Sequence, residues 1–156
     1  LVNHIKEVTP DSLNYLIKDM FETITLYQNR IIETKSKKLD NGKYKVDIEF
    51  KVSKYRNNEK GRAFYGEEER DSITYQTSDM KKPDYSVFLA DYIDLGIFGK
   101  DEDDNETELY LKKHKISSIH NKISIIVDKE PIEVGIDPYN KLIDTNSEDN
   151  RKKIEK

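Results

Sequence analysis

A strictly alternating segment follows a tight-turn sequence in the first third of the chain. After Asp40-Asn41-Gly42, every second side chain is apolar: Tyr44, Val46, Ile48, Phe50 and Val52. The positions between them carry charge: Lys43, Lys45, Asp47, Glu49 and Lys51. Because successive side chains of a strand point to opposite faces, this pattern predicts a half-buried antiparallel strand. A helix would need its apolar positions three or four residues apart.

The turn before this strand predicts a hairpin. Asn41-Gly42 suits a type I′ turn, because asparagine and glycine both tolerate the positive φ angles that this turn requires. The partner strand should then occupy about residues 29–38.

An apolar stripe at helical spacing precedes the hairpin. Thr9-Pro10-Asp11-Ser12 supplies a helix start. The stripe that follows predicts a helix of about four turns that fades near Tyr27; its members are Leu13, Leu16, Ile17, Met20, Phe21 and Ile24. We expect Leu16 or Ile17 to dock on the sandwich, and part of the stripe to remain available to a partner or a crystal neighbour.

Further short apolar segments follow, separated by polar loops. The strands are expected at 72–77, 86–98, 108–116, 122–128 and 132–136, with loops at 55–70 and 100–108. With no crossover helices between them, the strands predict an immunoglobulin-like antiparallel β-sandwich with one N-terminal α-helix. The expected divisions are a connecting helix at 1–28, the sandwich at 29–145 and a charged, frayed tail at 146–156.

Composition excludes several classes of function. The chain has 156 residues, no cysteine and a formal charge of −4, with both signs interspersed. Disulfides and cysteine-based metal sites are therefore absent, and no basic stripe favours nucleic acid. No apolar run reaches the roughly 18 residues that span a bilayer, so we expect no membrane insertion by this chain.

Two candidate cation sites are weak. The acidic stretch Asp101–Glu108 offers oxygen ligands, but Glu106 stands where a calcium loop needs glycine, and Lys112 where it needs glutamate. A solvated hairpin loop is favoured, and cation binding stays open. The histidines, His4, His114 and His120, form no H-E-x-x-H motif, so structural or exposed roles are favoured over zinc.

Two other stretches invite a binding function. Tyr55, Arg56, Lys60, Arg62, Phe64 and Tyr65 combine aromatic and basic side chains, yet the acidic run 67–69 follows at once and favours a solvated loop. At 135–144, Asp137-Pro138 should end a strand. Tyr139 and Leu142 are expected to be buried in a plug that caps the core, which is favoured over a ligand site.

Three segments resemble a known protein type. They are 12–27, the hairpin at 40–44, and 134–144 followed by Asp149-Asn150. Together they resemble the C-terminal region of a Bacteroidetes fusion protein, in which an ABC-transporter permease is joined to an aminopeptidase-N-like zinc metallopeptidase (a gluzincin). Thr145 departs from the resemblance, because a basic residue is expected there.

The resemblance implies a non-catalytic accessory domain, structural or domain-packing in role. The zinc-binding and exopeptidase motifs of that family lie upstream, so no catalytic, cofactor-binding or metal residue is assigned here, and zinc belongs to the parent. The expected partner is the upstream catalytic domain of the same polypeptide, in a membrane-associated parent with this domain outside the bilayer. The alternative is a free-standing extracytoplasmic module that recognises peptide or glycan through the loops at 55–82 and 100–108.

Overall fold

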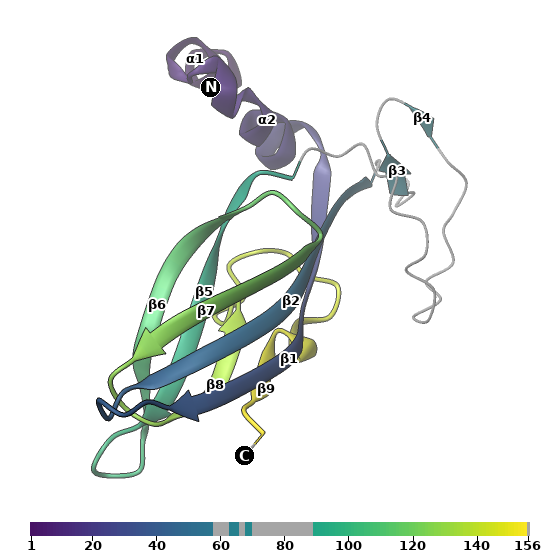
Figure 1. Cartoon of the computed structure of the whole chain (residues 1–156). Coiled ribbons are helices and arrows are strands. Elements are labelled where there is room, and N and C mark those ends of the chain that lie inside the picture. The colour runs from purple at the N-terminus through teal and green to yellow at the C-terminus, as the bar shows by residue number, and fades with distance from the viewer. Residues whose placement is uncertain (58–62, 66–67, 70–88, 156) are drawn as a thin grey trace. The chain divides into compact units, whose positions relative to one another are not determined.

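The computed structural model describes residues 1–57, 63–65, 68–69 and 89–155 (Figure 1). The chain divides into two compact units, which are described separately. The first unit comprises residues 1–26 and 54–88, and the second comprises residues 27–53 and 89–156. These boundaries differ from the expected division at residues 28 and 145, because one pair of long strands passes from one unit into the other.

The N-terminal segment of the first unit is a series of short helical pieces. They are α1 (Val2–Val8), the 3-10 helix η1 (Asp11–Leu13), α2 (Asn14–Ile17) and the π-helix η2 (Lys18–Glu22). The expected continuous helix to Tyr27 is wrong, because the chain is already extended at Ile24. β-Branched residues such as Ile24 and Thr25 pack well in strands, and this preference ends the helical segment early.

The apolar stripe of this segment is only partly buried. Ile17 is 3% exposed, whereas Met20 is 70% and Phe21 is 47% exposed. The stripe is therefore a mixture of buried and exposed residues, with Ile17 as its buried member. Docking on the sandwich and availability to a partner stay predictions. Elsewhere in this unit, the end of β2 pairs with β3 (Ala63–Tyr65), and β3 with β4 (Glu68–Glu69).

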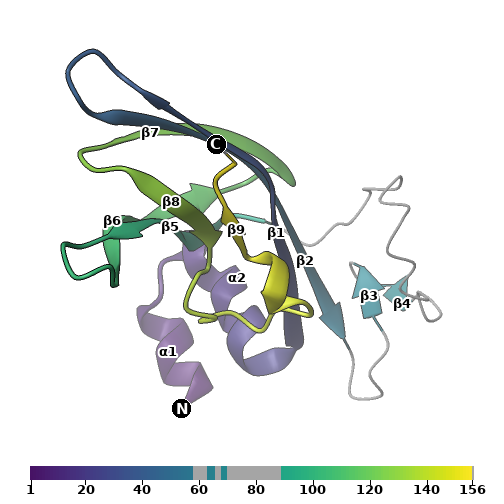
Figure 2. The ribbon, with the colours of Figure 1, turned by 90° about the horizontal axis from the view of Figure 1, so that it is seen from below.

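The second unit is built from two antiparallel sheets (Figures 1 and 2). In the first sheet, β2 lies between β1 and β7; in the second, the order is β6-β5-β8-β9. The strand bounds are β1 (Ile24–Lys38), β2 (Tyr44–Asn57), β5 (Asp91–Lys100), β6 (Glu106–Ile116), β7 (His120–Val127), β8 (Pro131–Ile136) and β9 (Arg151–Lys153). The expected mainly-β class is confirmed.

The core of this unit lies between the two sheets. The alternation in β2 is confirmed: Val46, Ile48, Phe50 and Val52 are buried, while the charged residues between them face out. The opposite sheet supplies the other half of the core with Ile93, Leu95, Ile97, Val134 and Ile136. The alternation of apolar and charged residues in β2 therefore determines which face of the first sheet packs against the second sheet.

The hairpin turn between β1 and β2 differs from the expected type I′ turn. Gly42 has a φ of 83°, but Asn41 does not share the positive φ that type I′ requires. The Gly42 N–H donates to the Leu39 carbonyl at 2.9 Å, and the Leu39 N–H donates to the Lys43 carbonyl at 2.8 Å. This is the three-residue hairpin, with a type I turn followed by a left-handed glycine.

Three other expectations differ from the structure. The loop expected at 55–70 is strand at its beginning, because β2 continues to Asn57. The strand expected at 72–77 lies outside the described residues, as do residues 86–88 of the next strand. The tail expected to fray at 146–156 contains η3 (Ser147–Asp149) and β9, which pairs with β8 and is thereby held in place.

Candidate functional site

The outer face of the second sheet carries a trough made by two glycines. Gly96 of β5 and Gly135 of β8 stand opposite each other in the ladder. A Cβ added at Gly96 would lie 2.8 Å from the Phe98 ring, and one added at Gly135 would lie 2.8 Å from Pro138. Only glycine lets these side chains lie flat against the backbone.

The Phe98 ring fills this trough and is fully buried. The Arg151 guanidinium lies 4.2 Å from its centroid, and the Tyr139 ring meets it edge-on at 6.2 Å. Both geometries place positive charge or a positive ring edge against an aromatic ring. A small second apolar cluster therefore forms outside the main core, with charged residues around it.

Asp94 accepts hydrogen bonds from two lysine side chains beside this cluster. Its carboxylate receives Lys141 Nζ at 2.7 Å and Lys113 Nζ at 3.3 Å. Burial alone would raise the pKa of Asp94, but the hydrogen bonds from Lys141 and Lys113 outweigh it and lower that pKa. Lys141 in turn has a raised pKa, because it donates to Asp94. The pair therefore stays ionised and fastens the 137–142 turn to the sheet.

Asp137 folds this turn. Its φ of 44° is left-handed, and its carboxylate accepts the backbone N–H groups of Lys141 at 3.0 Å and Leu142 at 2.8 Å. Burial raises the pKa of Asp137 in spite of these two hydrogen bonds. Both carboxylate oxygens are occupied by the turn itself, so the arrangement is suited to holding the backbone rather than to transferring a proton.

The rim of the cluster is also paired. Arg151 donates to Glu106 and Glu133, each at 2.5 Å, and the Tyr139 hydroxyl donates to Glu108. Leu142 packs against the core but is only partly buried, so its expected burial holds in part. Tyr139 is 46% exposed, so the expectation of a buried Tyr139 is wrong. Its hydroxyl reaches a partner at the surface instead of inside.

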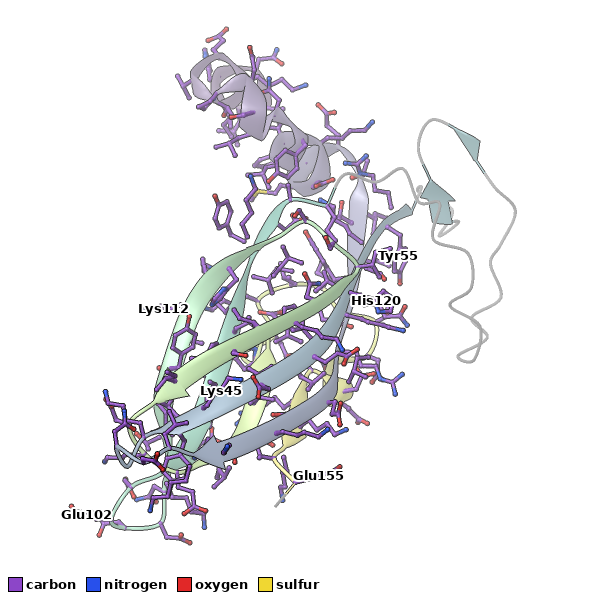
Figure 3. The ribbon with its side chains drawn as sticks, in the orientation of Figure 1. Lys45, Tyr55, Glu102, Lys112, His120 and Glu155 are labelled. Atoms are coloured by element: carbon purple, nitrogen blue, oxygen red, sulfur yellow. The ribbon has the colours of Figure 1, made fainter. Side chains whose placement is uncertain are left out.

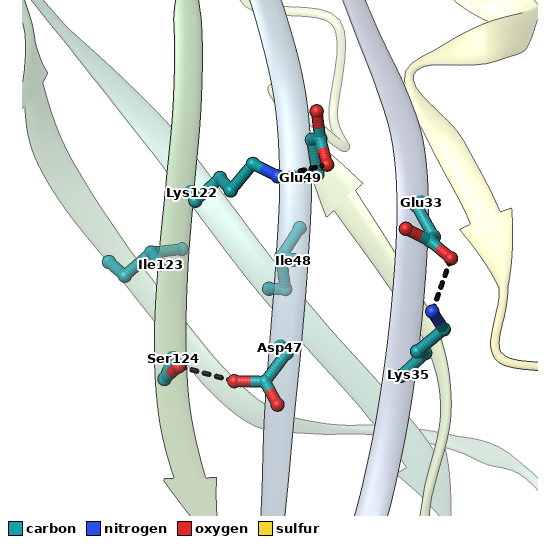
Figure 4. Close-up of a pocket in the computed structure, with 8 residues that line it drawn as sticks. All are labelled: Glu33, Lys35, Asp47, Ile48, Glu49, Lys122, Ile123 and Ser124. Carbon is teal, nitrogen blue, oxygen red and sulfur yellow. Dashed lines mark hydrogen bonds and ion pairs between the residues drawn. The ribbon is translucent and has the colours of Figure 1, made fainter.

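The outer face of the first sheet holds a shallow hollow (Figure 4). Glu33 and Lys35, both of β1, pair along one side of it at 2.6 Å. Two further pairs join opposite residues of β2 and β7: Lys122 with Glu49 at 2.8 Å, and Ser124 with Asp47. Such pairs between opposite residues stabilise a sheet. Their charges are matched, so the hollow is suited to a solvated face more than to a charged ligand.

No protein-family model, curated protein or solved structure matches this chain. The site therefore has to be judged on its own residues. None of the helices among the described residues is long and apolar enough to cross a membrane.

Sequence reasoning missed a buried ionic cluster in the first unit. Asp19 of η2 accepts Lys54 Nζ at 2.8 Å and Arg56 Nε at 2.9 Å, and the three side chains are 5%, 0% and 9% exposed. The Lys54 ammonium also lies 5.2 Å from the centroid of the Tyr15 ring. The burial of the two cations could have been predicted, because Lys54 and Arg56 occupy the same alternate positions of β2 as the inward-facing apolar residues before them. Nothing in the sequence identified Asp19 as their partner.

The acidic stretch forms the tip of the β5–β6 hairpin, where Glu102 projects (Figure 3). Asp101 accepts the backbone N–H groups of Asp103 at 3.0 Å and Asn105 at 2.8 Å, and Lys100 pairs with Asp104 at 2.5 Å. The hydrogen bond from the Asn105 backbone lowers the pKa of Asp101. The expected hairpin loop is confirmed, and the carboxylates of Asp101 and Asp104 hold its own turn.

The three histidines lie on different elements. His4 is in α1, His114 in β6 and His120 in β7. Within the described ranges, no group of three or more histidine, cysteine or acidic side chains is arranged to hold a metal ion. His114 Nε2 lies 2.7 Å from the Tyr110 hydroxyl, so this histidine already has a neighbour in its own strand.

The mixed aromatic and basic stretch is not a single solvated surface. Tyr55 and Arg56 are 7% exposed each and belong to β2. Lys60 and Arg62 lie outside the described residues. The backbone of Phe64 and Tyr65 forms β3. The expected solvated loop is therefore wrong at its beginning, because the buried carboxylate of Asp19 stabilises Arg56 inside the unit.

Acidification should destabilise the second unit through His114. Burial is the main cause that lowers the pKa of His114 below its ordinary 6.5, and the positive charge of Lys112 lowers it further. The native state then binds fewer protons than the unfolded state between the two pKa values, so stability rises with pH through that window. The contribution is complete above about pH 6.5 and is lost as pH falls through the folded-state pKa.

Thermal melts between pH 4 and pH 8, with an NMR titration of the His114 ring, will measure this effect. His114→Gln should remove this part of the pH dependence, whereas His120→Gln should leave it in place. An NMR titration midpoint at or above that of an unfolded histidine would contradict the expectation.

Proposed function

We propose that this chain is a non-catalytic accessory domain of a larger, membrane-associated aminopeptidase-like metallopeptidase and transporter protein. In this proposal the second unit is an immunoglobulin-like sandwich, and the N-terminal segment packs against the upstream catalytic domain of the same polypeptide. Zinc and the catalytic residues belong to that upstream domain.

The observation that carries this proposal is the outward apolar surface of the N-terminal segment. The helical pieces bury only Ile17 and Asp19, and leave large apolar side chains exposed. The exposed members, here called the N-terminal surface, are Val8, Leu13, Met20, Phe21 and Ile24. Apolar groups gathered on one segment are typical of a protein–protein contact.

The polar clusters of the second unit support the same role. Asp94, Asp137 and Arg151 are each engaged by neighbours that fasten turns to strands. A catalytic group needs a free acceptor or donor within reach of substrate. These side chains are instead used to hold the fold, as a packing domain requires.

Introducing a positive charge on the N-terminal surface should separate binding from stability. Met20→Lys and Phe21→Lys should weaken binding to the purified upstream domain by about tenfold or more, since the loss of a hot-spot side chain from an interface costs about 2 kcal/mol or more. The free energy of unfolding of the chain itself should change by less than about 0.5 kcal/mol, because both residues are exposed. Calorimetric titration and urea unfolding measure the two quantities.

Ile126→Lys is the matched control. Ile126 is 58% exposed on β7, outside the N-terminal surface, and its replacement should not affect binding. Equal weakening by all three variants would refute the proposed surface. A complete reading frame without an upstream metallopeptidase would favour the alternative, a binding module for peptide or glycan.

A further inference from the structure

Two asparagine amides of the second unit are buried without partners. Asn29 of β1 is 0% exposed, and Asn150, directly after η3, is 1% exposed. In the part of the chain that the structure describes, neither the oxygen nor the nitrogen of either side chain has a hydrogen-bond partner. A buried polar group without a partner is costly, and native interiors rarely tolerate one.

Both amides lie along the seam between β1 and the C-terminal segment. The Tyr27 N–H donates to the Ile143 carbonyl at 2.8 Å, and the Asn29 N–H donates to Asp144 Oδ2 at 2.8 Å. On the other side of that segment, the Ile136 N–H donates to the Asn150 carbonyl at 2.8 Å. Residues 143–150 therefore run between β1 and β8.

The residues next to the two asparagines form an ion pair across the seam. Arg30, which follows Asn29, lies with its Nε 3.8 Å from Asp149 Oδ2, and Asp149 precedes Asn150. Arg30 is exposed, so this pair closes the seam from outside while the fully buried amides lie inside it. The second carboxylate oxygen of Asp149 is buried there too, again without a partner among the described residues.

The chemistry of these groups selects their ligand. Each amide presents an NH2 donor and an oxygen acceptor, and Asp149 adds a further acceptor. A cation would satisfy only the oxygens, and an anion only the NH2 groups. Water both donates and accepts, and buried waters in proteins make about three hydrogen bonds each.

We propose that Asn29, Asn150 and the inner oxygen of Asp149 form an internal hydration site, which binds one or more long-lived water molecules. The bound water joins the C-terminal segment to β1. It forms hydrogen bonds with the buried side-chain groups that have no partner at this seam.

Water–protein cross-relaxation in the NMR spectrum of the ¹⁵N-labelled chain tests the site directly. The side-chain NH2 protons of Asn29 and Asn150 should show rotating-frame cross-peaks to water with a residence time longer than rotational tumbling. The exposed Asn3 side chain should show none of this kind. In Asn29→Leu, the Asn150 cross-peak should weaken or vanish, and ¹⁷O relaxation dispersion should lose at least one long-lived water. Asn3→Leu should lose none.

Two results would overturn the proposal. One is a direct contact between the two amides, seen as cross-peaks between their NH2 groups with no water peak. The other is a saturable shift of these resonances on addition of calcium chloride or sodium chloride, which would assign a cation instead. If Asn29→Leu does not fold, the wild-type spectra decide by themselves.

Discussion

Asp19→Ala should release the N-terminal segment from the end of β2. The carboxylate is shared by Lys54 and Arg56, and its loss leaves both cations buried without it. Removing one partner of a buried ionic cluster costs about 3–5 kcal/mol. Ile17 is the one apolar residue that the helical pieces of this segment bury, so its burial alone cannot offset a loss of this size.

Hydrogen exchange measured by mass spectrometry is the direct readout. Peptides covering residues 14–22 should lose protection by about two orders of magnitude or more, since each 1.4 kcal/mol is a factor of about ten. Asp11→Ala, an exposed carboxylate on the same segment, should leave that protection unchanged. Unchanged exchange in Asp19→Ala would show that the ionic cluster does not hold the segment.

Phe98→Ala should strongly destabilise the second unit. The ring is fully buried in the trough above Gly96, between Arg151 and Tyr139. Truncation of a buried phenylalanine costs about 3–5 kcal/mol, because it removes apolar contact and leaves a cavity. Urea unfolding followed by circular dichroism will measure the change in the free energy of unfolding.

A double-mutant cycle with Gly96→Ala will show whether the trough is the cause. Gly96→Ala alone should cost about 1–3 kcal/mol, because the new methyl group overlaps the Phe98 ring. In the Phe98→Ala background the same change should cost less, with a coupling energy of about 0.5–3 kcal/mol. Additive effects would mean that ring and glycine act independently. Ile126→Ala, exposed on the first sheet, is the control and should change stability little.

The strands were predictable where one face alone is buried. In β2 the alternation of apolar and charged residues agrees with the observed burial from Val46 to Val52. β7 and β8 begin within two residues of the expected positions. Periodicity reports on burial, and burial on one face is the property that these strands share.

The helical stripe was misleading for a related reason. Its spacing predicts a helix to Tyr27, yet Ile24 begins a strand and most of the stripe faces outward. Periodicity records which residues are apolar, but not whether their partner surface belongs to the same unit. The turn at Gly42 was also mispredicted from local sequence, since Asn-Gly is compatible with more than one hairpin geometry.

The sequence by itself determined the mainly-β class, the inward face of β2, the hairpin positions at 40–42 and 101–105, and the lack of cysteine chemistry. Each of these depends on residues that are neighbours along the chain. Only the tertiary structure decided that Asp19 meets Lys54 and Arg56, that Phe98 lies over Gly96, and that Asn29 and Asn150 are buried at one seam. The ionic cluster joins residues 35 and 37 positions apart, and the seam joins residues much farther apart, so no local pattern encodes these contacts. Gly96 and Phe98 are close in sequence, but the ring is enclosed by Tyr139 and Arg151 from distant parts of the chain. Folding brings such groups together from distant parts of the chain, and the low polarity of a buried site makes their pairing matter for stability.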